Sequence, residues 1–306
     1  MGEKDRHTPA PSGILNVNKP QGMTSHDVVN AVRKFAGTRQ VGHAGTLDPL
    51  ATGVLVVCVG QATRISEYLM ASRKVYRAKV RFGAATSTYD SEGEITATFP
   101  TQHLTPDMLR EALARFVGAI QQRVPPYSAV KQDGQPLYRR ARRGEPVEPP
   151  VREVQVYRAE LLEWELPVAT VEVECGPGTY IRSLAHDWGQ AAGCGAHLTS
   201  LMRLASGRFT LEEAVSLERL REASADGCLQ RHLIPMDEGL LDMKAIIVTE
   251  EQALALRQGQ PVPASAGETS QLARAYTLEG DFVAILRYNT PSGRWLPHKV
   301  FAGGDM

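Results

Sequence analysis

The chain has 306 residues, of which 42% are hydrophobic and 22% are charged, and its formal net charge is zero. This composition is typical of a folded globular protein and excludes an intrinsically disordered or fibrous chain. Because the chain has no net basic charge, binding to a polyanion would depend on local clusters of Lys and Arg. The length predicts one large domain and a smaller one.

The N-terminal segment and the cysteines indicate the cellular compartment. Residues 1–12 are polar, predict a flexible tail and lack the apolar segment of a signal peptide. No uninterrupted apolar run of about 18 residues follows. The four cysteines lie singly, without the paired spacing of a zinc or redox site, which predicts reduced thiols. We therefore expect a cytoplasmic protein that does not cross a membrane.

The first predicted elements are a strand, a turn and a helix. Residues 13–19 predict the strand, and the Pro-Gln-Gly sequence that follows predicts the turn. Thr24, with Asp27 three residues later, is a helix-start signature. Helically spaced valines come next, and Gly37 stands where a C-terminal cap is expected.

A glycine-rich loop at residues 42–49 leads into an apolar run at residues 53–59, which predicts a buried strand. Asp48 precedes a proline, and in isolation that pair favours an ordinary turn. A carboxylate beside so apolar a strand is costly unless it is paired or used, which makes Asp48 a candidate catalytic residue. The loop lacks the Lys-Ser or Lys-Thr of a phosphate-binding loop, and His43 has no partner at metal-ligand spacing. We expect no metal and no cofactor.

The strand predicted at residues 75–82 has one apolar and one basic face. Tyr76 lies on the apolar face, whereas Arg77 and Lys79 lie on the basic one. A second basic cluster occupies residues 122–150, a Pro-flanked insertion that predicts a protruding arm. Its basic residues are Lys131, Arg139, Arg140, Arg142 and Arg143. Either cluster could be a solvated charged face, but two on one neutral chain favour a polyanionic partner.

The remaining elements complete an α+β pattern. A helix is predicted to begin at Thr105-Pro106, with Val117 among its apolar residues and Gly118 as its stop. Strands are predicted at residues 151–161 and 168–175, followed by a helix whose start carries Arg182, where backbone N–H groups favour anions. We predict a mixed, mainly antiparallel sheet with flanking helices over residues 13–242. A small β-rich domain is predicted at residues 243–306, with a helix at 250–257 and strands at 282–288 and 295–301.

Several sequence motifs occur together in this chain. The most specific is Gly42-His43-Ala44-Gly45-Thr46-Leu47-Asp48-Pro49-Leu50-Ala51-Thr52-Gly53. The others, in chain order, are Asn18-Lys19-Pro20, Lys74-Val75-Tyr76, Tyr127-Ser128-Ala129, Gly178-Thr179-Tyr180-Ile181-Arg182 and Gly195-Ala196-His197-Leu198. In these motifs, from about residue 13 onward, the chain resembles the TruB family, the bacterial tRNA pseudouridine-55 synthases.

The resemblance implies a pseudouridine synthase fold and a set of site residues. Asp48 would be the catalytic aspartate, Arg182 its ion-pair partner, and Tyr76 the ring that stacks on the flipped uracil. The substrate-binding residues that it implies besides Tyr76 are His43, Tyr180, Leu201 and Lys19. Whether Asp48 acts as a nucleophile or as a base stays open.

The resemblance also implies tRNA as the partner. The insertion at 122–150 would grip the T-arm and elbow, and residues 243–306 would form a PUA-like domain near the acceptor end. We expect a monomer with no obligate protein partner. Two alternatives remain, the catalytic subunit of a guide-RNA-dependent pseudouridine synthase complex and a tRNA-folding chaperone, which could coexist with catalysis.

Overall fold

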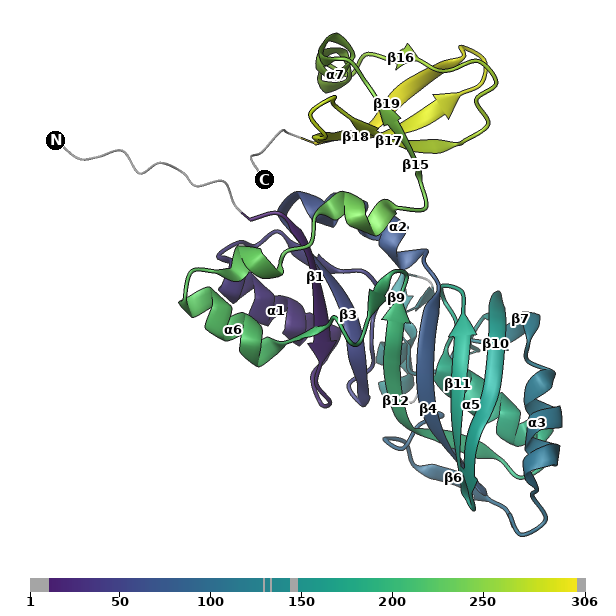
Figure 1. The fold of residues 1–306 in the computed structure, drawn as a ribbon. Coiled ribbons are helices and arrows are strands. Elements are labelled where there is room, and N and C mark those ends of the chain that lie inside the picture. The colour runs from purple at the N-terminus through teal and green to yellow at the C-terminus, as the bar shows by residue number, and fades with distance from the viewer. Residues whose placement is uncertain (1–10, 129, 133, 144–147, 302–306) are drawn as a thin grey trace.

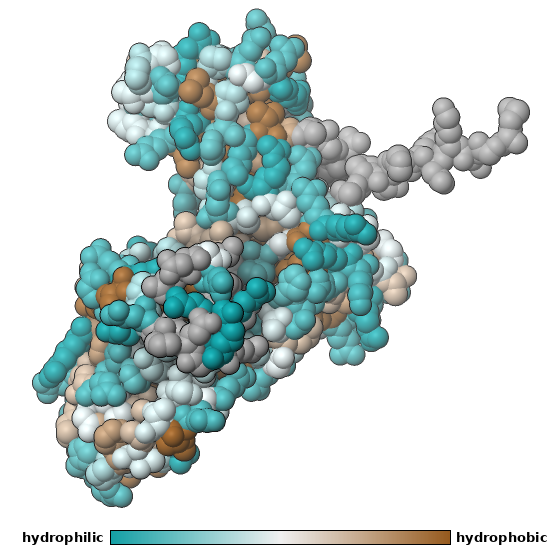
Figure 2. Space-filling view, turned by 180° about the vertical axis from the view of Figure 1, so that it is seen from behind, coloured by the Kyte–Doolittle hydropathy of each residue, from teal (hydrophilic) through white to brown (hydrophobic). Residues whose placement is uncertain are grey.

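The computed structural model describes residues 11–128, 130–132, 134–143 and 148–301 and arranges them in two parts (Figure 1). The larger part is built on one extended sheet with helices packed against it. The smaller, C-terminal part is a β-rich unit at one end of the larger one. Hydrophilic side chains cover most of the face in Figure 2, and hydrophobic ones form small scattered groups there. No helix among the described residues is long and apolar enough to span a membrane.

The main sheet has ten strands. They are β1 (Gly13–Lys19), β2 (Val41–His43), β3 (Ala51–Val59), β4 (Lys74–Phe82), β7 (Gly118–Arg123), β10 (Val151–Glu165), β11 (Val168–Cys175), β12 (Ala196–Ser206), β13 (Phe209–Thr210) and β14 (Val215–Ser216). Their order is β14-β1-β3-β12-β4-β11-β10-β7, with β13 beside β12 and β2 beside β3. Only the pairs β1–β14 and β3–β12 are parallel, so the predicted mixed, mainly antiparallel sheet is confirmed.

Helices pack against both faces of this sheet. The α-helices are α1 (Ser25–Ala36), α2 (Ser66–Met70), α3 (Pro106–Ala114), α4 (Leu137–Arg142), α5 (Ile181–Ala191) and α6 (Leu217–Ala225), and the 3-10 helices are η1 (Gly60–Ile65), η2 (Leu229–His232) and η3 (Met236–Leu240). The apolar faces of α1, α3 and α5 join the strands in one continuous core. Burial of this apolar surface fixes α5, and with it Arg182, against the sheet.

Two small hairpins extend from the larger part. One pairs β5 (Ala84–Thr86) with β6 (Ile95–Thr98), and the other pairs β8 (Lys131–Gln132) with β9 (Gln135–Pro136) inside the insertion. The insertion between β7 and β10 also contains α4. Gln122 and Arg123 belong to β7, so the insertion leaves the sheet after residue 123.

The C-terminal unit contains a five-stranded sheet in the order β15-β17-β18-β19-β16. Its elements are β15 (Lys244–Ile247), α7 (Glu250–Arg257), β16 (Val262–Pro263), β17 (Leu272–Tyr276), β18 (Phe282–Asn289) and β19 (Arg294–Val300). Phe301 and Ile285 share a buried cluster with Ile65 of η1. Lys299 lies 3.0 Å from the Glu67 carboxylate, so both apolar packing and an ion pair join the two parts.

The local signals of the sequence were mostly confirmed. Thr24 caps α1 with a reciprocal hydrogen bond to Asp27, and Gly37 ends that helix in the left-handed conformation. The prediction that the helix beginning at Thr105-Pro106 includes Val117 was wrong. The helix α3 ends at Ala114, and the Val117 side chain is 45% exposed.

Candidate active site

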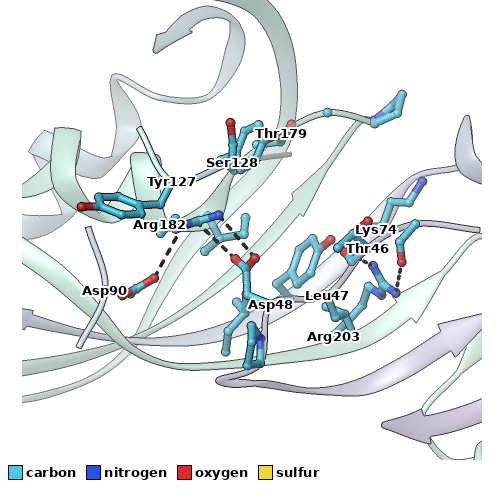
Figure 3. Close-up of a pocket in the computed structure, with 18 of the residues that line it drawn as sticks. Thr46, Leu47, Asp48, Lys74, Asp90, Tyr127, Ser128, Thr179, Arg182 and Arg203 are labelled. Carbon is cyan, nitrogen blue, oxygen red and sulfur yellow. Dashed lines mark hydrogen bonds and ion pairs between the residues drawn. The ribbon is translucent and has the colours of Figure 1, made fainter. Parts of the chain in front are cut away.

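A cavity of about 760 Å³ opens beside the loop that connects β2 to β3. Five of the seven predicted catalytic and substrate-binding residues line it, namely Asp48, Tyr76, Tyr180, Arg182 and Leu201. They come from the β2–β3 loop, β4, the start of α5 and β12, and Figure 3 shows the Asp48 and Arg182 side chains pointing toward each other.

The loop that carries Asp48 is anchored on both sides of the aspartate. The Ser25 hydroxyl donates to the Leu47 carbonyl at 3.1 Å and accepts from the Leu47 N–H at 2.8 Å. On the other side, the Gly22 N–H and the Lys19 ammonium donate to the Pro49 carbonyl at 2.8 and 3.4 Å. The carboxylate is therefore presented from a fixed backbone, as preorganised catalysis requires.

Asp48 and Arg182 form the predicted contact. Arg182 Nη2 donates to Asp48 Oδ1 at 3.3 Å, and Nε lies 3.2 Å from Oδ2. The Arg182 side chain is 7% exposed, whereas Asp48 keeps 32% exposure and remains accessible to a bound molecule. Burial raises the pKa of Asp48 above its ordinary value, and Arg182 opposes that rise.

Asp90 is a further acidic residue in the cavity that the sequence analysis did not select. Its Oδ2 lies 3.7 Å from Arg182 Nη1, so one guanidinium faces two carboxylates (Figure 3). Its Oδ1 accepts hydrogen bonds from the Thr88 hydroxyl at 2.5 Å and the Glu92 N–H at 3.1 Å. The only local signal was an acid among hydroxyl residues before a glycine, a pattern that also fits an ordinary turn.

Arg203 links the Asp48 loop to the sheet. Its guanidinium donates to the carbonyls of Val54 at 2.6 Å, Gly45 at 3.1 Å and Thr46 at 3.5 Å, and the side chain is buried. Arg203 is paired in register with Tyr76 on β4. The Tyr76 ring, 8% exposed, is thus held at the cavity wall.

The first residues of the insertion also reach the cavity. Tyr127 and Ser128 line it opposite Asp48, as Figure 3 shows. Lys74, at the start of β4, adds a positive charge, and burial lowers the pKa of this lysine to about 8, with Arg203 contributing. Lys74 belongs to one of the motifs named above, but the sequence analysis assigned no role to it.

His43 and Lys19 do not line the cavity. Lys19 is fully buried and donates to the Met23 and Pro20 carbonyls at 2.6 and 3.0 Å, as well as to Pro49, so it holds the backbone next to Asp48. Substrate contact by Lys19 stays a prediction. His43 Nδ1 is buried without a hydrogen-bond partner, and burial lowers the pKa of this imidazole. Substrate contact by His43 stays a prediction.

The basic face of β4 is separated from the cavity. Successive residues of a strand point to opposite faces, so Arg77 and Lys79 lie on the side opposite Tyr76. Arg77 Nη2 lies 3.1 Å from the carboxylate of Glu172, its neighbour on β11. The expectation that these two residues bind phosphate next to the site therefore gains no support from the geometry.

The predicted basic residues of the insertion lie on β8, on α4 and, for Arg143, directly after α4. Arg139 is exposed, Arg140 is half-buried, and Arg143 Nη2 donates to Gln135 Oε1 at 2.6 Å. For Lys131 and Arg142 only the backbone is described. Within the described part of the chain, no group of three or more His, Cys, Asp or Glu side chains is placed to hold a metal ion.

Comparisons with known proteins agree with this site. The model of the TruB family pseudouridylate synthase N-terminal domain matches residues 33–181, and that of the tRNA pseudouridylate synthase B C-terminal domain matches residues 182–241. A protein of Dehalococcoides mccartyi named tRNA pseudouridine synthase B is 43% identical over 94% of this chain and 96% of its own. Its namesake in Pseudomonas aeruginosa is 42% identical over 94% and 95%.

Solved structures show the same fold in RNA-protein complexes. A chain of an H/ACA RNP bound to a substrate RNA containing 2′-deoxyuridine is 26% identical, with a TM-score of 0.72, over 95% of this chain and 85% of that one. A chain of the archaeal box H/ACA sRNP Nop10-Cbf5 complex gives a TM-score of 0.71 at 26% identity, over 95% and 86%. With relatives more than 40% identical along most of its length, the chain belongs to the TruB family of pseudouridylate synthases.

Proposed function

We propose that this protein is a tRNA pseudouridine-55 synthase, an isomerase that converts uridine 55 in the T-loop of tRNA into pseudouridine. The observation that carries the proposal is the Asp48–Arg182 ion pair in a cavity whose wall is formed by Tyr76. Relatives named tRNA pseudouridine synthase B, similar along nearly the whole chain, support tRNA as the substrate.

The reaction breaks the bond between N1 and C1′, rotates the uracil, and joins C5 to C1′. C5 loses its proton and N1 takes one up, so the composition of the nucleotide is unchanged. The base cannot rotate while it is stacked in RNA, so it must be flipped out at a cost of a few kcal/mol. Stacking on an aromatic ring returns about 1–3 kcal/mol per base, and Tyr76 is the ring that we assign to this contact. Leu201 and Tyr180 would enclose the base from two further sides.

We assign Asp48 as the residue that acts on the target nucleotide when the glycosidic bond is cleaved. Cleavage leaves positive character on C1′, which an ionised carboxylate can stabilise, attack, or relieve by removing a sugar proton. Burial raises the pKa of this carboxylate, and Arg182 opposes that rise and so favours the ionised form. We assign no metal or cofactor to the reaction.

RNA recognition would be divided between the two parts of the protein. We assign residues 13–242 to catalysis, the insertion that follows β7 to the T-arm and elbow, and residues 243–306 to a PUA-like domain near the acceptor end. The arginines of α4 suit phosphate contacts, which position RNA without reading its sequence. We also propose that the protein acts in the cytoplasm as a monomer.

A second candidate is the catalytic subunit of a guide-RNA-dependent complex, because the similar solved chains come from H/ACA particles. The insertion that we assign to tRNA binding favours a stand-alone enzyme. A third candidate is a tRNA-folding chaperone. This activity could coexist with catalysis, because the tRNA elbow must open before the target base is flipped out.

The decisive experiment uses the purified full-length protein and an unmodified tRNA transcript labelled with tritium at uracil C5. Wild-type protein alone should release tritium, and a transcript with cytidine at position 55 should not release it. Asp48→Asn should bind the transcript with unchanged affinity and release none. Asp107→Asn, whose carboxylate is 93% exposed on α3, is the matched control with wild-type release. Absence of release by wild-type protein that binds the transcript would refute the proposal.

A further inference from the structure

Tyr89 has an unusual backbone conformation directly beside the site. Among the described residues it is the only one other than glycine with a positive φ, at 66°. A bulky L-residue rarely adopts this left-handed conformation, because its Cβ crowds the following carbonyl. Such strain persists only where the surroundings hold it, and it gathers at functional sites. The next residue along the chain is Asp90, which faces Arg182.

The Tyr89 ring fastens this turn to α5. It stacks on the imidazole of His186 with a centroid distance of 3.9 Å and an angle of 18° between the rings. His186 is four residues after Arg182 on the helix, so the two lie on one face. Tyr89 contacts His186, and the next residue, Asp90, contacts Arg182. This segment of the chain is therefore attached to α5 at two points.

The hydrogen bonds of the turn hold it to itself and to β12. The Leu198 N–H donates to the Tyr89 carbonyl at 3.0 Å, and the Ser91 N–H donates to the Leu198 carbonyl at 2.8 Å. Within the turn, the Thr86 hydroxyl donates to the Asp90 carbonyl at 2.7 Å. These bonds set the shape of the turn and join it to β12, whereas the stack joins it to the helix that carries Arg182.

We propose that Tyr89 is a positioning residue for the isomerisation, an inference that rests on the function proposed above. Its left-handed backbone and its stack on His186 hold Asp90 where the Arg182 guanidinium is shared between Asp90 and Asp48. Without the ring, the turn relaxes away from α5, Asp90 withdraws, and Arg182 is left with Asp48 alone.

This sharing has a measurable effect on Asp48. The titratable groups that interact electrostatically with Asp48 are Arg182 from α5, Asp90 from the turn, Lys19 from β1, and the hydroxyls of Tyr76 and Tyr180. Asp90 raises the pKa of the Asp48 carboxyl, whereas Arg182 and Lys19 lower it. Withdrawal of Asp90 therefore lowers that pKa, and Asp48 stays ionised to a lower pH. The acid limb of the rate profile should move to lower pH.

The test compares substitutions of Tyr89 in the full-length protein, with release of C5 tritium from a tRNA transcript as the assay. Tyr89→Asn and Tyr89→Gly tolerate the left-handed backbone but remove the ring, so kcat should fall on the order of tenfold or more. KM should be unchanged, and the acid limb should move to lower pH. Tyr89→Phe keeps the stack and should match the wild type in both respects.

A control and a structural measurement complete the test. Tyr157→Asn removes a tyrosine that is 38% exposed on β10 and stacks with Arg73, and it should leave kcat and the acid limb unchanged. In a crystal structure of Tyr89→Asn, the separation of Arg182 Nη1 and Asp90 Oδ2 should increase beyond 3.7 Å. This distance needs no turnover, so it tests the inference even if the proposed reaction is wrong.

Three results would overturn the inference. The first is wild-type kcat with an unmoved acid limb in Tyr89→Asn and Tyr89→Gly. The second is an equal loss in Tyr89→Phe, which would assign the effect to the hydroxyl instead of the stack. The third is an unchanged contact between Arg182 and Asp90 in the crystal structure of Tyr89→Asn.

Discussion

The side-chain amide of Gln122 binds both backbone polar groups of Tyr180. Its Oε1 accepts from the Tyr180 N–H at 2.8 Å, and its Nε2 donates to the Tyr180 carbonyl at 3.0 Å. Gln122 is buried on β7, just before the insertion, and Tyr180 precedes α5, the helix that carries Arg182. The pair therefore connects the base of the insertion to the start of α5.

Removal of these two hydrogen bonds should weaken both the fold and the reaction. Gln122→Met keeps the length of the side chain but leaves the Tyr180 N–H unpaired, so the free energy of unfolding should fall by about 1–3 kcal/mol. The kcat for tritium release should also fall, because the start of α5 loses its anchor. Chemical denaturation and single-turnover release measure the two effects.

The neighbouring residue provides the control. Gln121 lies on the same strand with its side chain exposed, so Gln121→Met should change stability by less than about 0.5 kcal/mol. Equal destabilisation by the two substitutions would show that the hydrogen bonds of Gln122 with Tyr180 do not account for the loss of unfolding free energy.

Asp90→Asn should change the pH dependence of the enzyme. Burial holds the pKa of Asp48 above its ordinary value, so the wild type should lose activity at a higher pH than an exposed aspartate would allow. Asp90 adds to that rise, and its neutralisation should move the acid limb to lower pH. The amide keeps an oxygen for the Thr88 hydroxyl, which limits the structural change.

The measurement is a profile of tritium release against pH at saturating tRNA, with Asp107→Asn as the exposed control. If the acid limb stays in place or moves to higher pH, the inference that Asp48 and Asp90 share the Arg182 guanidinium would be contradicted.

Lys74 should make RNA affinity depend on pH above neutrality. Its ammonium donates to the Met70 and Ser72 carbonyls at the edge of the cavity, and burial lowers its pKa to about 8. The cavity therefore loses a positive charge as the pH rises through that value, and affinity for the tRNA transcript should fall. Lys74→Arg stays charged and should bind equally well from pH 7 to 9.

Lys19 also has a pKa lowered to about 8 by burial, but it does not line the cavity and is present in both proteins, so the comparison isolates Lys74. A parallel loss of affinity in the wild type and Lys74→Arg would exclude Lys74 as the cause.

Local sequence signals predicted the elements well, because helix caps and strand alternation depend on near neighbours. The capped helix α1 and the alternating strand β4 are examples. The net charge of a sheet surface depends instead on strand register, because register decides which residues of other strands lie beside each charged side chain. Arg77 was assigned to phosphate binding from its own strand, but its partner Glu172 is 95 residues away in the chain. No pattern within one segment could reveal that neutralisation.

The site was predictable in its centre and not in its surroundings. Asp48 stood out through its loop, and its pairing with Arg182, 134 residues distant, was expected from the resemblance. Asp90 lies in an irregular turn without periodicity, and its place depends on the strained backbone of Tyr89. The short strands β15 and β17 were missed for a related reason, since neither has a long alternating pattern.

Gly53 should be the most sensitive glycine of the catalytic sheet. Its φ is 95°, and a Cβ added there would lie 2.3 Å from the Arg203 carbonyl oxygen on the adjacent parallel strand β12. Gly53→Ala must therefore push β3 and β12 apart and disturb the Arg203 guanidinium, which anchors Gly45 in the Asp48 loop. Unfolding free energy should fall by about 2–4 kcal/mol, and tritium release should fall with it.

Gly280→Ala separates crowding from backbone strain. Gly280 has the same φ of 95°, but a Cβ there would meet no atom within 4 Å. Its replacement should cost only the strain of the left-handed backbone, about 1–2 kcal/mol, and should leave kcat unchanged. Thermal unfolding and single-turnover release of both variants decide the point. If Gly53→Ala is no more harmful than Gly280→Ala, close contact between β3 and β12 is not what holds the Asp48 loop.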